Sequence, residues 1–392
     1  MTQRKKVFLY ITDAGGGHRG SAKSLKAAIE AKGLPWDVSI VNVYRSIWPA
    51  IEPGAKYLDF YGEDAYNWVL EHNWTSLAVW MKPPARWIAA FNRKKGGQLM
   101  TAWLAQEKPD LGLSCMPFVN DIFSDAHERA GIPLALICTD LVDVKPYMWF
   151  TPKILSQAVF VAAGCEEAQR QAREAGAGGR ALLSGLVIHP KHFDPKARQL
   201  PQRAAREHFG LEAEPFTVLI VMGGYGGPSI KQFALSFEKA GRRWQVLACC
   251  GKNEALKAAL DQLAPSMQNK LVPIGFTKEL HLLMRAADLI VSKPGPASLQ
   301  EALAMGCPMA LDNAQTMPQE VPNADWVTGL GAAIKVERRP DMAAAVAALG
   351  EDPGRLASMR AAIARYAVPQ GTELIIEAMA KALDGAEAPV PA

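Results

Sequence analysis

The residue types best suited to binding an anion lie between Lys293 and Glu301. Residues 288–292 form a short apolar run typical of a buried strand, and a Pro-Gly-Pro turn follows them. A helix is then predicted over Ser298–Met305. A helix that begins after such a turn presents free N–H groups and roughly half a positive charge to a bound anion. An ordinary strand–turn–helix connection with a surface glutamate is the alternative.

His18 is a second candidate, and it lies in a glycine loop after the first predicted strand, Val7–Thr12. A helix is predicted to follow the loop, from about Ser21 to Lys32. The dipole of this helix would lower the pKa of the imidazole and keep it neutral, which is the state that a general base requires. A histidine that only caps the loop is the alternative.

The same loop, Gly15–Gly20, has the spacing G-x-G-x-x-G of dinucleotide-binding proteins. That interpretation also needs an acidic residue near the end of the second strand, where it would bind a ribose. The second strand, which begins at Trp36, ends instead at Asn42, Val43 and Tyr44. An NAD-dependent oxidoreductase is therefore a minor alternative.

The composition indicates a globular α/β protein. The chain has 392 residues, of which 49% are hydrophobic and 21% charged, and its net charge of +4 gives no indication of nucleic-acid binding. The six cysteines lack metal-site spacing and are expected to be reduced and buried in a cytoplasmic protein. Because no apolar run approaches the roughly 18 residues of a membrane span, any membrane contact is expected to be peripheral.

Alternating strand and helix patterns predict two doubly wound halves. Strands are expected near 111–114, 134–139 and 159–162, and then at 217–222, 245–250, 271–274 and 289–292. The proline-containing stretch 185–201 predicts a linker. The expected domains are residues 1–196 and 197–369, with a last helix at 370–385 that packs on the first domain. Two such halves place a ligand-binding cleft between the carboxyl ends of two parallel sheets.

A second glycine loop, residues 222–229, occupies the corresponding place in the second half. It lacks the Gly-Lys-Ser/Thr ending of a Walker loop, so an ATPase is disfavoured. Its clustered glycines indicate that the backbone closely approaches a ligand or the other domain. His189 and His192 have no third partner and are predicted to be structural rather than metal ligands.

Three motifs together resemble the monogalactosyldiacylglycerol synthase and processive diacylglycerol glucosyltransferase family. They are TDAGGGHRGSA at 12–22, SKPGPASLQEALAMGCP at 292–308 and Gln-Glu-x-x-Asn at 319–323. More distantly, the chain is similar to the enzyme that adds GlcNAc to lipid I in peptidoglycan synthesis. The resemblance covers nearly the whole chain. It implies an α/β GT-B fold, in which two Rossmann-like doubly wound domains face each other across a cleft.

The resemblance implies an inverting transfer of a hexose from a UDP-sugar to a membrane lipid. His18 would be the general base, Asp13 would orient or assist it, and Gly15, Gly16 and Gly17 would form the acceptor loop. The implied donor-binding residues are Gly223, Gly224, Ile274, Gly275, Phe276, Lys293, Gly295, Pro296, Ser298, Glu301, Gln319, Glu320 and Asn323.

The resemblance also divides these donor-binding residues by role. Ile274–Phe276 would bracket the uracil, Glu301 would bind the ribose, and Ser298 with the turn at Gly295 would hold the diphosphate. Gln319 and Glu320 would bind the sugar. Folds of this type stabilise departing UDP with a helix dipole and hydroxyl groups. No cofactor and no essential metal ion are therefore expected.

The sequence departs from the family pattern at two places near the donor site. Ala297 stands where the family has a glycine, and Tyr225 stands where the plant enzymes have an acidic residue. The identity of the sugar, galactose, glucose or GlcNAc, therefore stays open.

A tryptophan-rich stretch predicts contact with a membrane. Six of the ten tryptophans lie between Trp48 and Trp103, and residues 72–106 contain no Asp or Glu. Tryptophan prefers the membrane interface, and basic side chains are attracted to anionic headgroups. The residues expected to contact the membrane or the acceptor are Trp74, Trp80, Trp87, Lys82, Arg86, Arg93, Lys94 and Lys95. The alternative is a tryptophan-rich core with a solvated basic edge.

The sequence thus predicts a cytoplasmic enzyme, peripheral on the inner face of the membrane, that transfers galactose or glucose from UDP to diacylglycerol or a related lipid. Its expected partners are a UDP-sugar, the lipid acceptor and an anionic membrane surface, and not nucleic acid. One alternative is a UDP-GlcNAc transferase with a lipid-linked or lipopolysaccharide acceptor. Another is an inactive nucleotide-sugar- or lipid-binding protein, against which the joint presence of His18, Glu301, Gln319 and Asn323 argues.

Overall fold

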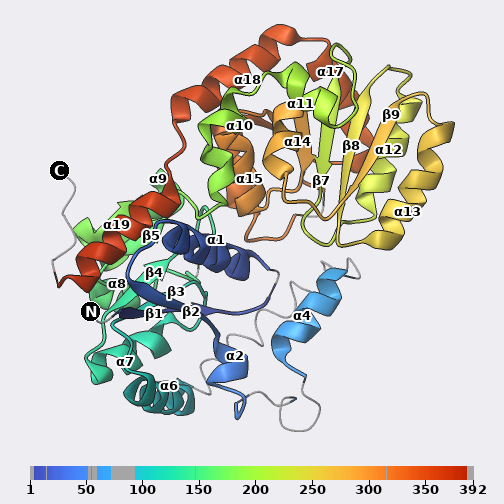
Figure 1. Cartoon of the computed structure of the whole chain (residues 1–392). Coiled ribbons are helices and arrows are strands. Elements are labelled where there is room, and N and C mark those ends of the chain that lie inside the picture. The colour runs from blue at the N-terminus through green and yellow to red at the C-terminus, as the bar shows by residue number, and fades with distance from the viewer. Residues whose placement is uncertain are drawn as a thin grey trace. The chain divides into compact units, whose positions relative to one another are not determined.

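The chain divides into two compact units (Figure 1). In this computed structural model the described residues are 4–385, except 15, 52–53, 55–59, 72–92, 146 and 315. The first unit is Met1–Pro190 with Pro369–Ala392, and the second is Lys191–Val368. The first division in the chain lies at residue 190, where the sequence placed it at 196.

The first unit is built on a six-stranded parallel sheet with strand order β2-β1-β3-β4-β5-β6. Its strands are β1 (Lys5–Ile11), β2 (Trp36–Asn42), β3 (Leu111–Ser114), β4 (Leu134–Ile137), β5 (Val161–Ala163) and β6 (Ala181–Leu183). Its helices are α1 (Gly17–Ala31), α2 (Val43–Ser46), α4 (Gly62–Glu71), α6 (Arg93–Glu107), α7 (Asn120–Ala130), α8 (Pro152–Gln157), α9 (Glu166–Ala172), η1 (Arg173–Ala177), η2 (Gly178–Arg180) and α19 (Gly371–Leu383).

Both faces of strand β1 are covered by helices, as expected for a parallel sheet. On one face, Leu9 belongs to a core cluster with Leu25 of α1 and Met379 of α19. On the other face, the ring of Tyr10 lies 5.2 Å from that of Phe123 of α7. The C-terminal helix α19, drawn in red, lies beside α1 (Figure 1). The last helix of the chain therefore completes the core of the first unit.

The second unit contains another six-stranded parallel sheet, with strand order β12-β11-β10-β7-β8-β9. Its strands are β7 (Thr217–Val221), β8 (Gln245–Gly251), β9 (Lys270–Gly275), β10 (Leu289–Ser292), β11 (Met309–Asp312) and β12 (Ala333–Val336). Its helices are α10 (Pro195–Gln199), α11 (Gln202–His208), α12 (Ser229–Lys239), α13 (Glu254–Leu263), α14 (Leu280–Ala286), α15 (Pro296–Ala304), α16 (Val321–Gly329), α17 (Met342–Gly350) and α18 (Pro353–Tyr366), with short turns η3 (Pro190–Phe193), η4 (Ala264–Ser266) and η5 (Arg339–Asp341).

Each sheet has one place where the strand order reverses. In the second sheet this place lies between β7 and β10, and in the first between β1 and β3. Loops that follow the two central strands diverge there, and doubly wound proteins bind ligands at this point. Because Val221 pairs with Ser292, the glycine loop after β7 and the turn after β10 begin side by side.

The structure differs from the sequence prediction at several element boundaries. The strands β6, β11 and β12 were not predicted, and each has only three or four residues. Helix α1 begins at Gly17 rather than Ser21, so His18 lies in its first turn. Helix α15 begins at Pro296, because proline is favoured at the first helical position.

Local capping explains two further differences. Val43 and Tyr44 were predicted to end the second strand, but they begin α2, because the Asn42 side chain accepts a hydrogen bond from the Arg45 N–H. The predicted linker contains α10, which Asp194 caps in the same way through the Lys196 N–H.

The six cysteines are free and buried, as predicted. Burial raises the pKa of the Cys115 and Cys307 thiols to about 12, so these thiols stay protonated at neutral pH. Among the helices in the described part of the chain, none has the length and apolar character needed to cross a membrane.

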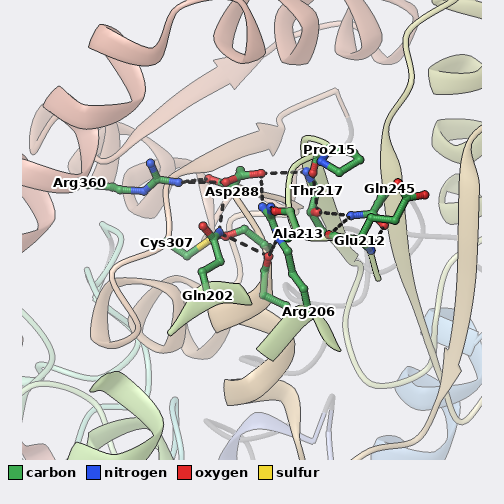
Figure 2. Close-up of polar contacts among 12 residues, drawn as sticks. Gln202, Arg206, Glu212, Ala213, Pro215, Thr217, Gln245, Asp288, Cys307 and Arg360 are labelled. Atoms are coloured by element: carbon green, nitrogen blue, oxygen red, sulfur yellow. Dashed lines mark hydrogen bonds and ion pairs between the residues drawn. The ribbon is translucent and has the colours of Figure 1, made fainter. Parts of the chain in front are cut away.

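Figure 2 shows a polar network at the amino ends of β7 and β10. The buried Arg206 of α11 places its Nη2 atom 2.6 Å from Asp288 Oδ2. The same carboxylate accepts hydrogen bonds from the Thr217 N–H at 2.9 Å and from Gln202 Nε2 at 3.1 Å. Arg206 also donates to the carbonyl oxygen of Ala286. The network therefore holds α11 against the start of the two central strands.

Asp288→Ala is expected to lower the free energy of unfolding by about 3–5 kcal/mol, because it leaves the buried Arg206 guanidinium without its counter-ion. The matched control is Arg203→Ala on the same helix, which removes an exposed ion pair to Glu207. That pair contributes about 0.5 kcal/mol or less. Urea denaturation followed by tryptophan fluorescence measures both changes, and similar losses in the two variants would show that Asp288 is not an anchor.

Candidate active site

His18 is held by side chains that follow other strands of the first sheet. Its Nδ1 atom lies 2.9 Å from Oγ1 of the buried Thr139, which follows β4. Its ring centroid lies 5.7 Å from that of the fully buried Trp149. The Trp149 indole in turn donates a hydrogen bond to Asp140 Oδ2 at 2.8 Å. These contacts fix both the position and the plane of the imidazole.

Burial lowers the pKa of His18 to about 4, while a hydrogen bond to the backbone of Cys115 acts in the opposite direction. The imidazole is therefore neutral at physiological pH, as the sequence predicted, but the main cause is burial rather than the helix dipole. When Nδ1 carries the proton and donates to Thr139, the lone pair on Nε2 is available to accept a proton. The arrangement fits a general base.

Asp13 was expected to orient His18, but its carboxylate has another partner. Its Oδ1 atom lies 3.1 Å from Nη1 of Arg19. Of the two acceptor-loop glycines in the described residues, Gly16 has φ +81° and is the N-cap of α1, and Gly17 is its first residue. Thr139 and Trp149 thus occupy the place that the prediction gave to Asp13.

In the second unit, the turn Lys293–Gly295 leads from β10 into α15. Gly295 is the N-cap of α15, no side chain caps the helix, and its first hydrogen bond runs from the Leu299 N–H to the Gly295 carbonyl. The N–H groups of Ala297 and Ser298 precede that bond and point along the helix axis towards its start. This helix end therefore offers the anion-binding groups that the sequence predicted.

Two charged side chains lie beside this turn. Lys293 Nζ is 3.7 Å from Oε1 of Glu320, and the glutamate is buried whereas the lysine is partly exposed. A Cβ atom built on Gly295 would lie 3.7 Å from both side chains, and one built on Gly223 would lie 3.5 Å from Lys293. The structure therefore brings together four of the predicted donor-binding residues, of which Lys293 and Gly295 lie in the turn and Gly223 and Glu320 each come from another loop.

Asn323 contacts the backbone of this turn. It is completely buried, and its Nδ2 atom donates to the carbonyl oxygen of Pro294 at 3.3 Å. Gln319 is partly buried, and its Nε2 atom lies 3.4 Å from the Met317 sulfur. Asn323 is therefore placed to shape the turn, while the partly exposed Gln319 and the buried Glu320 directly precede α16.

The second glycine loop is shaped mainly by a neighbouring turn of the same unit. Gly226 has φ +60°, and a Cβ atom there would meet the Cys250 carbonyl oxygen at 2.1 Å. Gly251 similarly packs on the carbonyl of Gly224, which accepts a hydrogen bond from the Lys252 N–H at 3.0 Å. The exposed Gly224 has open space around its α-carbon. Gly226 is thus required by packing within the second unit, while Gly223 and Gly224 remain available to a ligand.

The carboxyl end of β9 presents an exposed aromatic ring. Phe276 follows the strand directly and is 68% exposed, the highest value among the large apolar side chains described. Ile274 and Gly275 before it are partly buried. An exposed ring costs free energy in water unless something covers it, so this place suits the stacking of a flat base.

Glu301 lies in the second turn of α15, where burial raises the pKa of its carboxyl from 4.5 to about 7. In the described part of the chain, no side-chain hydrogen bond or ion pair of this carboxyl is found. A partly buried carboxyl group without such partners is a candidate for binding a ligand that carries hydroxyl groups.

The predicted membrane-contact residues fall into two groups. Trp74, Trp80, Trp87, Lys82 and Arg86, like Gly15 of the acceptor loop, lie outside the described residues. The other three, Arg93, Lys94 and Lys95, begin α6 and are exposed.

Two of these three basic residues already have partners. Arg93 lies 3.2 Å from Asp125 and 3.8 Å from Asp121, both on α7. Lys95 donates to the carbonyl oxygen of Ala50 at 2.9 Å. Of this trio, Lys94 is therefore best placed to meet an anionic surface.

Sequence reasoning missed the roles of Thr139 and Trp149. The available signal was that Thr139 ends the strand predicted at 134–139, at the edge of the sheet where ligands bind. In the described residues no group of three or more His, Cys, Asp or Glu side chains is arranged to bind a metal ion.

Comparison with known proteins agrees with this geometry. Residues 217–344, which contain the turn, Glu301 and Glu320, match the glycosyltransferase family 28 C-terminal domain. The processive diacylglycerol β-glucosyltransferase of Bacillus cytotoxicus is 26% identical over 383 residues, covering 96% of this chain and 94% of that protein. The enzyme of the same name from Bacillus subtilis is 25% identical, covering 97% and 96%. The predicted family resemblance is confirmed.

Solved structures confirm the GT-B fold. MurG of Acinetobacter baumannii has a TM-score of 0.63 at 15% identity, covering 96% of this chain and 99% of that one. The S. aureus MnaA–UDP structure has a TM-score of 0.60 at 13% identity, covering 97% of both chains. At these identities the likeness shows the fold alone.

The His18 imidazole is expected to titrate near pH 4 in the folded protein, as measured by its ring chemical shifts in NMR spectra, with His18→Asn to assign the signal. The unfolded state, in which histidine has a pKa of about 6.5, then binds more protons below that pH. The stabilisation due to neutral His18 is therefore lost as the pH falls from about 6.5 towards 4. His18→Asn should flatten this part of the stability curve. A titration near pH 6.5 would contradict the burial of the ring.

Proposed function

We propose that the protein transfers a hexose from a UDP-sugar to diacylglycerol or a related membrane lipid, with inversion at the sugar carbon. The match of residues 217–344 to the glycosyltransferase family 28 C-terminal domain supports this proposal. The observation that supports the donor most directly is the uncapped start of α15, with Lys293 and Glu320 beside it. Glucose is the favoured sugar, since the relatives from Bacillus are named β-glucosyltransferases.

The second unit would bind the nucleotide along the carboxyl ends of β9, β10 and β11. Phe276 would stack on the uracil, and the α15 N–H groups with Ser298 and Lys293 would bind the diphosphate. The Glu301 carboxylate would accept hydrogen bonds from the ribose hydroxyls. Glu320 would bind the sugar hydroxyls. Its long contact with Lys293 would then be replaced by shorter charge-assisted hydrogen bonds to these hydroxyls.

The first unit would supply the base. Nε2 of neutral His18 accepts the proton of the acceptor hydroxyl while its oxygen forms a bond to C1 of the sugar. The bond from C1 to the β-phosphate oxygen breaks on the opposite side, and its electron pair leaves with UDP. Since UDP-glucose carries an α-linked sugar, one displacement gives a β-linked product, in keeping with the names of the relatives.

No essential metal ion is included in this proposal. The charge that develops on the leaving diphosphate would be stabilised by the start of α15, by the Ser298 hydroxyl and by Lys293. These groups are fixed before the reaction, so they need no reorganisation as the bond breaks.

The lipid acceptor would place the protein on the inner face of the membrane, where UDP-sugars are available. The relatives named for diacylglycerol support this acceptor, and so does the basic start of α6, where Lys94 is exposed. Basic residues near an anionic surface contribute about 1 kcal/mol each.

Product analysis by mass spectrometry tests the function. Wild-type protein is expected to convert UDP-glucose and diacylglycerol in anionic vesicles to glucosyldiacylglycerol, with or without EDTA. His18→Asn should lower the turnover number about 10²–10⁴-fold, because a general base is lost, while the Kd for UDP stays within twofold. Parallel reactions with UDP-galactose and UDP-GlcNAc identify the sugar. Absence of glycolipid with every donor, or a variant as active as wild type, would overturn the assignment.

The affinity for UDP-glucose is expected to rise about tenfold between pH 6 and pH 8. Only ionised Glu301 accepts hydrogen bonds from the ribose, and a carboxyl group with a pKa of about 7 becomes ionised over this range. Calorimetry measures the affinity, and the donor is UDP-glucose because its phosphates do not titrate there. Glu301→Gln should bind more weakly and without this pH dependence, so a wild-type affinity that is flat with pH would rule out the role of Glu301.

A further inference from the structure

Helix α4 holds both backbone groups of Asp13. The Glu63 carboxylate accepts a hydrogen bond from the Asp13 N–H at 2.7 Å, and Asn67 Nδ2 donates to the Asp13 carbonyl oxygen at 2.8 Å. Glu63 and Asn67 are four residues apart, so they lie on the same side of the helix. Asp13 is the second residue after β1, at the beginning of the loop that ends at His18.

The Glu63 carboxylate is buried, and it joins three segments of the first unit. Besides the Asp13 N–H, its Oε2 atom accepts a hydrogen bond from Thr12 Oγ1 at 3.0 Å. Its Oε1 atom accepts from Asn42 Nδ2 at the end of β2 and from Arg45 Nε in α2, both at 2.8 Å. A buried carboxylate with four donors is costly to disturb, because any donor left behind is also desolvated.

The loop that Glu63 contacts is rich in glycine. Glycines occupy positions 15, 16 and 17, and no side chain caps the start of α1. Glycine has the greatest backbone freedom of all residues, so a run of three does not fix the direction of the chain that follows it. The position of His18 must therefore be set by contacts at the two ends of the loop.

We propose that Glu63, assisted by Asn67, is a positioning residue for the general base. Through Thr12 and Asp13 it fixes the main chain where the loop begins, and Thr139 fixes the imidazole where the loop ends. This inference rests on the proposed function for its effect on the rate, but the effect on the loop does not depend on any reaction.

The adjacent carboxylate Asp64 provides a matched control. It lies on the same helix and accepts hydrogen bonds from the same Arg45, and from the Tyr61 N–H at 2.9 Å. These contacts of Asp64 run to Arg45 of α2 and to Tyr61, which directly precedes α4. If Glu63 served only to hold Arg45 and α4 together, Asp64→Asn and Glu63→Gln would have the same consequences.

Glu63→Gln keeps the shape of the side chain but turns an NH₂ group towards either the Thr12 and Asp13 donors or the Asn42 and Arg45 donors. It should lower kcat about tenfold or more, whereas the Kd for UDP, a property of the other unit, stays within twofold. Asp64→Asn should leave kcat within twofold. Amide hydrogen exchange of residues 12–20, measured without substrate, should accelerate in Glu63→Gln and not in Asp64→Asn.

A second variant covers the case in which Glu63→Gln does not fold. Asn67→Leu removes the hydrogen bond to the Asp13 carbonyl and leaves the Glu63 carboxylate in place, and it should give a smaller change of the same kind, in both kcat and exchange. Equal exchange of residues 12–20 in wild type, Glu63→Gln (or Asn67→Leu) and Asp64→Asn overturns the inference. If exchange changes as expected but wild-type protein transfers no sugar, the positioning of the loop stands and the proposed function fails.

Discussion

Parallel pairing between β7 and β10 is the constraint on which the candidate donor site depends. Because the two strands are neighbours and point the same way, the glycine loop after one and the turn after the other start at the same edge. The chain order then reverses, so the following helices lie on opposite faces of the sheet and leave this edge uncovered. The ion pair between the buried Arg206 and Asp288 fixes the opposite ends of the same two strands. A shift in either strand would therefore separate Gly223 from Lys293.

The candidate sites of the two units need opposite electrostatic properties, since one must attract an anion and the other must keep a base neutral. In the second unit, the first N–H groups of α15 have no partner within the helix and would attract an anion. The partly exposed Lys293 would attract it as well. In the first, a base must remain neutral, and burial against Trp149 achieves this by disfavouring the charged imidazole. Removal from water, which lowers the pKa of His18, raises that of Glu301. The direction of each pKa shift follows from the charged form of the group, which is the protonated form for histidine and the deprotonated form for glutamate.

The glycines of the second unit separate into two kinds once the structure is known. Gly226 and Gly251 have positive φ angles and lie against carbonyl groups of neighbouring turns, so any side chain there would collide with the backbone. They are required by the packing of the loop after β7 on the last residues of β8. Gly224 and Gly295 have no such neighbour, and for them the close approach of a ligand is the remaining reason for lacking a side chain. A glycine-rich pattern alone does not make this distinction.

The sequence by itself determined the two sheets and the glycine turns at their carboxyl edges, because these depend on local periodicity and on short motifs. The same motifs single out His18 and Glu301 as candidate site residues. It did not predict β6, β11 and β12, although it did predict β3, β4, β5 and β10, which are equally short. It also did not predict the contact of His18 with Thr139. Which side chain meets another across a sheet depends on strand order, and only the tertiary structure brings Thr139 to His18, Asn323 to the turn before α15, and Glu63 to Asp13.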